Sequence, residues 1–376
     1  MGSQRYDVAI AGGGPAGAAA AIMLARSGLR VVVADARRKR ETSRGHGFQV
    51  GEGLPPSARH LLRALNVHDQ VLHDGHRASP GTIAFWGNPV AHCNDFIHQL
   101  HGPGLQLDRM RFDMSLREAA RSAGATLFES TRVQVDDATS RHTSHAPYSL
   151  QLCTNGSRTR SIEADWVLDA SGRAASLARA LGSSRVRHDC LIALYQRLRS
   201  NQHSDQDGRT WIEAVEDGWW YSVLLPSGER LIAFLCDADG GPDPSLKEPT
   251  SFWNSLKRAS NLHALCVQHQ YVPVGRPRGA DASSSSLDVA AGPGWLAVGD
   301  AALAFDPLSS KGISNALYTG LQAAHTIIAA NLGDRGAVER YAAHLHGIHE
   351  AYRLHLSQFY AMETRWPQAT FWRRRR

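Results

Sequence analysis

Residues 6–35 read YDVAIAGGGPAGAAAAIMLARSGLRVVVAD, and this stretch decides the fold. The apolar run at 6–11 predicts a buried strand, and the alanine-rich run at 15–27 predicts a helix. The valines at 31–33 predict a second strand. A strand, a helix and a strand within about 30 residues form a βαβ unit with parallel strands. We therefore expect an α/β protein with a Rossmann-like sheet.

The turn between the first strand and the helix, GGGPAG at 12–17, has the spacing GxGxxG. Gly12 permits the tight turn, Gly14 lets the backbone approach a pyrophosphate, and Gly17 allows close packing of helix and strand. Phosphate groups are stabilised at such a helix N-terminus by its unpaired N–H groups.

Pro15 and Ala16 begin this helix, and we place both in the binding site. Asp35 ends the second strand, where a carboxylate can accept hydrogen bonds from ribose hydroxyls. The unit therefore predicts a dinucleotide site, and NAD and FAD both remain open on this stretch alone.

A second segment, WLAVGDAALAFDPLSSKGI at 295–313, predicts a strand, a turn and the start of a long helix. It resembles the second FAD fingerprint of flavoprotein monooxygenases of the p-hydroxybenzoate hydroxylase and geranylgeranyl reductase type. The resemblance implies contacts between this segment and the ribityl, pyrophosphate or ring part of FAD, made by Gly299, Asp300, Pro307, Gly312 and Ile313.

Two further segments resemble motifs of the same family. LDRMRFD at 107–113 resembles its DRxxFD stretch and implies that Arg109 lies near FAD, whereas LDASGR at 168–173 resembles its DxSGR motif and implies the same of Asp169. We also assign Val133 to the cofactor site. The chain contains no second nucleotide fingerprint, so NAD(P)H is expected to bind FAD-loaded protein only transiently, as the reductant.

Three side chains are candidates for catalysis. The helix that begins near Gly312 would direct its positive end at the N1–C2=O edge of the flavin, and Lys311 could add positive charge there. Asp306 is expected to position Lys311 or a water molecule, and Glu52 is expected to act as an acid or base near the flavin.

GEGLPP at 51–56 resembles the GE-x-LPP segment that tryptophan halogenases share with non-halogenating relatives. DGWWYSVLLP at 217–226 lies where halogenases have W-x-W-x-I-P, with Tyr221 in place of the second tryptophan. Flavin halogenases need a lysine some tens of residues after the GE segment, and this chain has none from 40 to 246. Arginine stays protonated and cannot replace it. We therefore expect an enzyme that does not halogenate.

The C-terminal segments FYAMETRWP at 359–367 and FWRRR at 371–375 extend the resemblance to the LodB/GoxB-like flavoproteins of tryptophylquinone cofactor biogenesis. This implies an FAD-, NAD(P)H- and O₂-dependent monooxygenase that hydroxylates a tryptophan of a protein or peptide precursor through a flavin C4a-hydroperoxide. Trp219, Trp220 and Tyr221 are the candidate substrate contacts. Three alternatives remain open: oxygenation of a small aromatic metabolite, reduction of an isoprenoid double bond, and an FAD-dependent chaperone for a quinoprotein precursor.

α/β segments flank β-rich ones along the chain, which predicts a discontinuous FAD domain of the glutathione reductase type 2 class with an inserted antiparallel substrate domain. The expected ranges are 1–75, 107–187 and 277–333 for the FAD domain, 76–106 and 188–276 for the substrate domain, and 334–376 for a C-terminal helical segment.

Composition sets the remaining expectations. The net charge of +6 is modest, and no basic stripe with interleaved aromatics accompanies it, so we expect no nucleic-acid partner. Five widely spaced cysteines without a CxxC favour a reducing compartment and give no zinc site. The chain shows no signal peptide and no apolar run of about 18 residues, which favours a cytoplasmic protein without a membrane partner. The histidines lack a metal-ligand context, so no metal is expected.

Overall fold

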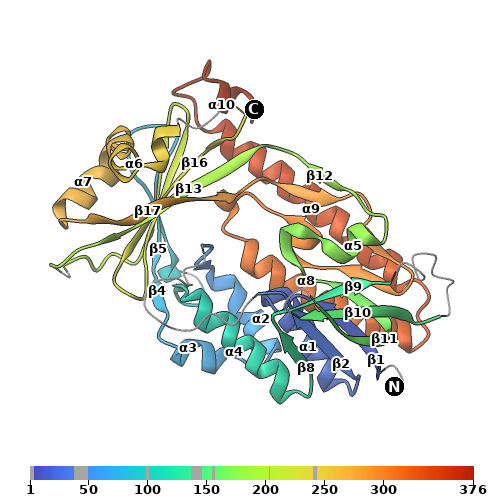
Figure 1. The fold of residues 1–376 in the computed structure, drawn as a ribbon. Coiled ribbons are helices and arrows are strands. Elements are labelled where there is room, and N and C mark those ends of the chain that lie inside the picture. The colour runs from blue at the N-terminus through green and yellow to red at the C-terminus, as the bar shows by residue number, and fades with distance from the viewer. Residues whose placement is uncertain are drawn as a thin grey trace.

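The computed structural model of the chain describes residues 4–37, 50–98, 101–136, 146–154, 157–202, 204–239 and 244–376. It consists of two large sheets with helices packed against them, joined by the long C-terminal helix (Figure 1).

The first sheet is the predicted Rossmann-like one. Its core has the order β20-β11-β1-β2-β8, and every pair in it is parallel. β9 and β10 form an antiparallel extension, and β19 pairs antiparallel with β20. The strands are β1 (Gln4–Ala11), β2 (Val31–Asp35), β8 (Thr126–Glu129), β9 (Thr131–Val135), β10 (Tyr148–Thr154), β11 (Ser157–Asp169), β19 (Ala291–Gly292) and β20 (Trp295–Ala297).

Three helices pack on this sheet because their small and apolar residues fit closely. α1 (Pro15–Arg26) has proline in its first turn and is followed by Gly28, whose φ of +87° ends the helix. α8 (Gly312–Asn331) crosses α1 so closely that a Cβ on Gly320 would lie 2.3 Å from the Ala16 carbonyl oxygen. α4 (Arg109–Ser122) starts at Asp108, whose side chain accepts a hydrogen bond from the Arg111 N–H.

The second sheet has the order β17-β13-β16-β15-β14-β5-β6 and is antiparallel except between β14 and β5. Its strands are β5 (Gly81–Phe85), β6 (His92–Asp95), β13 (Leu191–Arg199), β14 (Thr210–Val215), β15 (Gly218–Leu224), β16 (Arg230–Asp237) and β17 (Val272–Asp281). These strands come from the two segments expected to form the substrate domain, although β17 runs five residues past the expected boundary at 276 (281 − 276 = 5). The domain boundaries themselves stay a prediction.

The predicted fold class is confirmed, but several elements differ from the expectation. The segment from 190 to 275 also contains two helices, α6 (Pro249–Ser255) and α7 (Ser260–Gln268), which cover the outer face of the second sheet (Figure 1). Helical structure after the GEGLPP segment is divided into a 3₁₀ turn (Pro56–Ala58) and α2 (Arg59–Ala64), because Pro55 and Pro56 restrict its start. Short apolar helices and buried strands have the same composition, so periodicity does not separate them.

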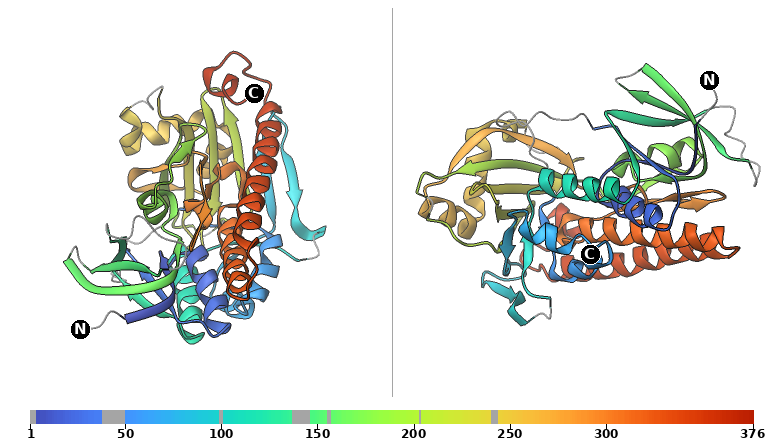
Figure 2. Two further views of the ribbon diagram at one scale, coloured as in Figure 1. Left: turned by 90° about the vertical axis from the view of Figure 1, so that its right-hand side faces the viewer. Right: turned by 90° about the horizontal axis from the view of Figure 1, so that it is seen from below.

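The C-terminal helix α9 (Ala337–Ala361) runs from the first sheet to the second, and α10 (Thr370–Arg373) ends the chain beside the second sheet (Figure 2). The remaining elements are α3 (His68–His73), α5 (Ser176–Ala180), a small sheet of β3 (Gly53–Leu54), β4 (Arg77–Ser79) and β7 (Gly104–Gln106), and another of β12 (Arg185–Arg187), β18 (Ser285–Leu287) and β21 (Leu303–Ala304).

Candidate functional site

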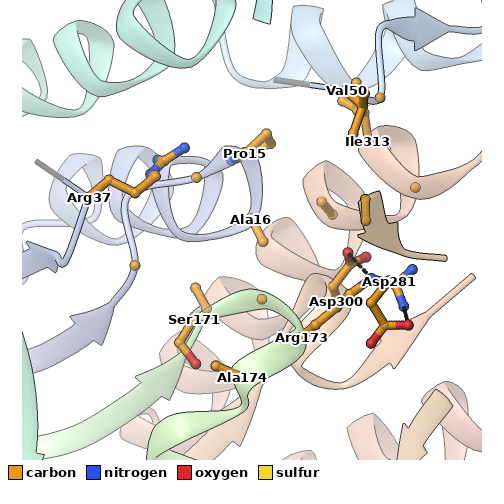
Figure 3. A pocket seen from close by; sticks show the side chains of 18 of the residues that line it. Pro15, Ala16, Arg37, Val50, Ser171, Arg173, Ala174, Asp281, Asp300 and Ile313 are labelled. Atoms are coloured by element: carbon orange, nitrogen blue, oxygen red, sulfur yellow. Dashed lines mark ion pairs between the residues drawn. The ribbon is translucent and has the colours of Figure 1, made fainter. Parts of the chain in front are cut away.

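A cavity of about 1020 Å³ lies between the two sheets. The first sheet contributes the glycine turn, β9 and the loop after β11, and the second contributes β13, β15, β16 and β17. The loop before α8 and the N-terminus of α8 complete the wall (Figure 3). This volume is at the upper end of the range for ligand sites, which suits a dinucleotide together with a second molecule.

The glycine turn has the shape that a pyrophosphate needs. Gly12 has φ +107°, and a Cβ there would lie 2.3 Å from the Ala170 carbonyl oxygen. A Cβ on Gly17 would lie 2.0 Å from the Gly12 carbonyl oxygen, so both positions require glycine. A Cβ on Gly14 would instead have only the Arg37 guanidinium nearby, at 3.9 Å. The backbone at Gly14 is therefore open to the cavity, and these residues fit FAD.

Asp35 lines the cavity, but both of its carboxylate oxygens already accept hydrogen bonds from arginines. The Arg37 guanidinium donates to both carboxylate oxygens at 2.8–3.1 Å, the Arg37 N–H donates at 3.0 Å, and Arg117 donates at 3.3 Å. Burial raises the pKa of the Asp35 carboxyl, yet Arg37 and Arg117 outweigh burial and hold it below its usual value. Arg37 would have to move for Asp35 to accept a ribose hydroxyl, because a carboxylate offers about four acceptor positions.

Asp300 lies opposite the glycine turn, with 38% of its side chain exposed to the recess (Figure 3). Arg173 lies between two carboxylates, 3.7 Å from Asp300 and 3.6 Å from Asp281. The recessed position raises the pKa of Asp300, although Arg173 and Arg185 oppose this. Asp300 is thus placed to accept hydrogen bonds from a ligand that crosses the cavity.

The loop before α8 brings Asp306, Pro307, Lys311, Gly312 and Ile313 to the cavity wall. Lys311 is the N-cap residue of α8 and is exposed, and no ion pair of its ammonium group is found among the described residues. The first N–H groups of a 20-residue helix and a cation thus meet at one point of the wall.

Asp306 is held in a different way from the one expected. Its carboxylate accepts from the Leu308 N–H at 2.8 Å and from the Tyr360 hydroxyl at 2.7 Å, so it positions its own loop. Among the described residues, no hydrogen bond or ion pair joins its carboxylate to Lys311. Trp219 donates to the same Tyr360 hydroxyl at 3.2 Å. Burial raises the pKa of Asp306 to about 6, against the lowering by these two donors.

Glu52 is 1% exposed and lines the cavity beside Tyr221, whose hydroxyl donates to Oε2 at 3.4 Å. Oε1 is buried and has no hydrogen-bond partner among the described residues. Burial raises the pKa of Glu52 to about 7, against lowering by backbone N–H groups, by the charge of Arg109 and by Tyr221. Arg109 also lines the cavity and donates to the Gly51 carbonyl at 2.8 Å, which fixes the loop that carries Glu52.

Of the three aromatic residues expected to contact substrate, only Tyr221 lines the cavity. Trp219 and Trp220 are both fully buried. Trp220 points to the outer face of the sheet and stacks on Phe234 at 5.0 Å, because successive side chains of a strand alternate between faces. Trp219 shares the face of Tyr221 but is covered by the C-terminal aromatics Tyr360 and Trp372. The structure therefore corrects the prediction for both tryptophans.

Three other predicted residues support the cavity without lining it. A Cβ on Gly299 would lie 2.9 Å from the Cβ of Ala16, so Gly299, like Gly17, permits close packing. Asp169 is buried and accepts from the Ser171 N–H at 2.9 Å and the Ala178 N–H at 2.8 Å, which shapes the loop after β11. The remaining predicted cofactor residues do line the cavity: Gly12, Gly14, Pro15, Ala16, Asp35, Arg109, Val133, Asp300, Pro307, Gly312 and Ile313.

Apart from Tyr221, sequence reasoning missed the residues that the second sheet contributes. Tyr195, Ala193, Ala233 and Ala280 line the cavity from three strands. The alternation of side chains along 191–199 places Ala193 and Tyr195 on one face and could have indicated both. Arg37 carries no such signal, because its importance depends on contacts with Asp35 and with Asp113, to which it donates at 2.7 Å.

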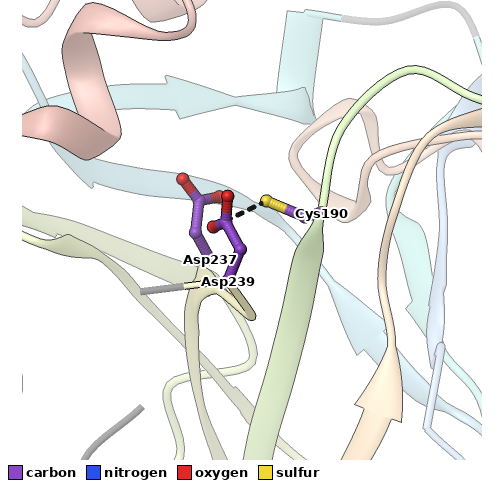
Figure 4. A group of neighbouring side chains, drawn as sticks. All are labelled: Cys190, Asp237 and Asp239. Atoms are coloured by element: carbon purple, nitrogen blue, oxygen red, sulfur yellow. Dashed lines mark hydrogen bonds between the residues drawn. The ribbon is translucent and has the colours of Figure 1, made fainter. Parts of the chain in front are cut away.

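A group of potential metal ligands lies apart from the cavity, where Cys190, Asp237 and Asp239 bring ligand atoms within 4.8 Å of one another (Figure 4). The Arg374 guanidinium donates to Asp239 at 2.6 Å and to Asp237 at 3.1 Å, so an arginine already supplies the positive charge. Arg375 is largely buried and also pairs with Asp237. These two arginines of the C-terminal run are therefore used within the molecule.

The comparisons with known proteins agree with this site. Residues 5–344 match the family described as FAD binding domain. LodB of Marinomonas mediterranea, by its name an FAD-dependent oxidoreductase, is 28% identical over 384 residues, which cover 99% of this chain and 97% of LodB.

Two solved structures share the fold. The myxobacterial chondrochloren halogenase CndH superposes with a TM-score of 0.86 at 22% identity, covering 99% of this chain and 86% of CndH. The peptidyl tryptophan dihydroxylase QhpG superposes with a TM-score of 0.77 at 23% identity, covering 99% of this chain and 78% of QhpG. None of the helices described here has the length and apolar character needed to cross a membrane. The cavity with its glycine turn and the family match over residues 5–344 together establish that the chain belongs to the FAD-binding domain family and is an FAD-dependent oxidoreductase.

Proposed function

We propose that the protein is a monooxygenase that uses FAD, NAD(P)H and O₂ to hydroxylate a tryptophan side chain of a protein or peptide precursor. The observation that carries this proposal is one cavity that joins the glycine turn to an apolar, tyrosine-bearing face of the second sheet, with the buried Glu52 carboxyl beside it. The similarity to LodB and to the peptidyl tryptophan dihydroxylase QhpG supports this choice of substrate.

When FAD is bound and reduced by NAD(P)H, it supplies activated oxygen to an electron-rich ring. Gly12 and Gly14 would hold its pyrophosphate, and Asp300 would accept hydrogen bonds from its polar chain. Lys311 and the N-terminus of α8 would stabilise negative charge on the flavin ring.

The protein's own acid–base groups then manage the protons. Glu52, with a pKa raised to about 7, exchanges a proton with the substrate near neutral pH. Asp306 keeps the 306–308 loop in place through the Leu308 N–H and the Tyr360 hydroxyl. The apolar wall excludes water from the reacting ring.

Halogenation is disfavoured because no lysine occurs from 40 to 246. The direct test incubates FAD-loaded protein with NAD(P)H, air, chloride and a tryptophan-containing precursor. NAD(P)H oxidation that depends on the precursor, with a gain of the mass of one or two oxygen atoms, supports the proposal. A gain of the mass of chlorine, or no change with every plausible precursor, overturns it.

A further inference from the structure

The cavity face of the second sheet has one alanine between two tyrosines. Ala233 on β16 pairs with Tyr195 on β13 at one side and with Tyr221 on β15 at the other. All three residues line the cavity, and of these only Tyr221 was predicted from the sequence. We call this group the 195–233–221 slot.

The dimensions of the slot suit one flat ring. Neighbouring strands lie about 4.8 Å apart, so the two tyrosine positions are separated by roughly 9.6 Å across Ala233. A ring held midway would have a tyrosine on each side at about 4.8 Å, within the separation that aromatic pairs prefer. Leu231 and Leu235, two residues before and after Ala233, bound the slot along β16 and also line the cavity.

The ends of the slot join the parts of the site already described. Val50, next to the Gly51–Glu52 loop, packs against the same apolar cluster as Tyr195 and Tyr221. Leu308, from the loop that the family resemblance places beside the flavin ring, packs in the same cluster as both tyrosines. A ring in the slot would therefore lie between Glu52 and the expected position of the flavin.

Glu52 supplies the polar recognition. Its Oε2 accepts from the Tyr221 hydroxyl at 3.4 Å, whereas Oε1 is buried in the cavity wall and has no partner among the described residues. A buried acceptor without a donor is costly, and a ligand N–H that reaches it removes that cost.

We propose that the 195–233–221 slot binds the substrate's planar ring with its N–H donating to Oε1 of Glu52, so that the site selects aromatic rings with a ring N–H, of the indole type. This inference rests on the proposed function and deepens it by assigning the specificity. The small side chain of Ala233 limits the size of the ring that fits, and Glu52 accepts the hydrogen bond of the ring N–H.

The test measures binding of indole and of 1-methylindole to FAD-loaded protein by the change in flavin fluorescence. The unaltered protein should bind indole about ten-fold more tightly than 1-methylindole, because methylation removes the donor. Glu52→Leu should reduce this preference to about one, since the buried acceptor is gone. Equal binding of both probes by the unaltered protein, or an unchanged preference in Glu52→Leu, overturns the assignment of Glu52.

Ala233→Leu should fill the slot and weaken indole binding by about ten-fold or more, while FAD stays bound. Ala84→Leu is the matched control, because Ala84 lies on β5 of the same sheet and does not line the cavity. Tyr195→Ala removes one wall of the slot without adding bulk. If Ala233→Leu loses FAD, indole binding by Tyr195→Ala tests the slot in its place. Indole binding unchanged in Tyr195→Ala would overturn the slot.

The two proposals fail separately. Selective indole binding without any oxygenated tryptophan product would leave the slot intact and refute the proposed function. Oxygenated product formed equally by Ala233→Leu and Tyr195→Ala would leave the function intact and refute the slot.

Discussion

The two ends of the cavity are built in different ways. The cofactor end is made of backbone: Gly12 and Gly14 lie in one turn of consecutive residues, and the N-terminus of α8 lies opposite. The end that we assign to the substrate is made of side chains on separate strands, such as Tyr195, Ala233 and Tyr221. A backbone turn tolerates almost no substitution, whereas side chains on a sheet can change one at a time. The cofactor end should thus be common to the family and the substrate end specific to this chain.

The largest effect should come from Gly12→Val, which tests the backbone end. The new side chain would meet the Ala170 carbonyl at a φ of +107°, so we expect loss of bound flavin and of much of the soluble protein. Flavin absorbance of the purified protein measures this. Gly347→Ala, on α9 with nothing within 4 Å, is the control and should keep its flavin. Normal flavin content in Gly12→Val would show that the turn is not the cofactor site.

Glu52→Gln tests the substrate end through its pH dependence. The folded-state pKa of about 7 exceeds the ordinary value of 4.5, so Glu52 contributes stability below pH 4.5 that is lost as the pH rises to about 7. Glutamine has no charge to bury. The difference in the free energy of unfolding between the variant and the unaltered protein should therefore rise by about 2 kcal/mol, in favour of the variant, from pH 5 to pH 8. Urea unfolding at both pH values measures the difference, and a gain that does not depend on pH would contradict it.

Tyr360→Phe tests the link between the 306–308 loop and the second sheet. The hydroxyl joins Asp306 of the cofactor-side loop to Trp219 of the second sheet, and Tyr360 is 2% exposed. Its loss leaves two buried polar groups without a partner, so the free energy of unfolding should fall by about 1–3 kcal/mol. Tyr318→Phe is the matched control, because its hydroxyl bonds to the exposed His344. An equal loss in the free energy of unfolding for both variants would mean that the buried Tyr360 hydroxyl contributes no more to stability than an exposed one.

The smallest effect should come from Arg374→Ala at the C-terminal end. Arg374 pairs with Asp237 and Asp239, but it is exposed and water can replace its contacts. We expect unchanged flavin content and an unchanged melting temperature. Arg375→Ala should lower the melting temperature more, because Arg375 is largely buried and its guanidinium lies 3.7 Å from the centre of the Phe371 ring. The reverse order would contradict this account of the tail.

The same difference explains what the sequence could predict. The Rossmann-like sheet and most of the cofactor wall were predictable, because Gly12, Gly14 and Asp300 lie in contiguous motifs whose spacing carries the chemistry. The substrate wall was not, because Ala233 meets Tyr195 and Tyr221 only through strand register. The resemblance of the 217–226 segment favoured Trp219 and Trp220, and their burial depends on contacts with helices and a C-terminal segment that are distant in the sequence.

The most direct test of the proposed function follows the origin of the oxygen. FAD-loaded protein, NAD(P)H and a tryptophan-containing precursor peptide are incubated under oxygen-18 gas in chloride buffer, and the product is sequenced by tandem mass spectrometry. We expect heavy oxygen on the ring of one tryptophan, in one or two atoms, and none on other residues. An unlabelled or chlorinated tryptophan, with NAD(P)H consumed, would contradict the account.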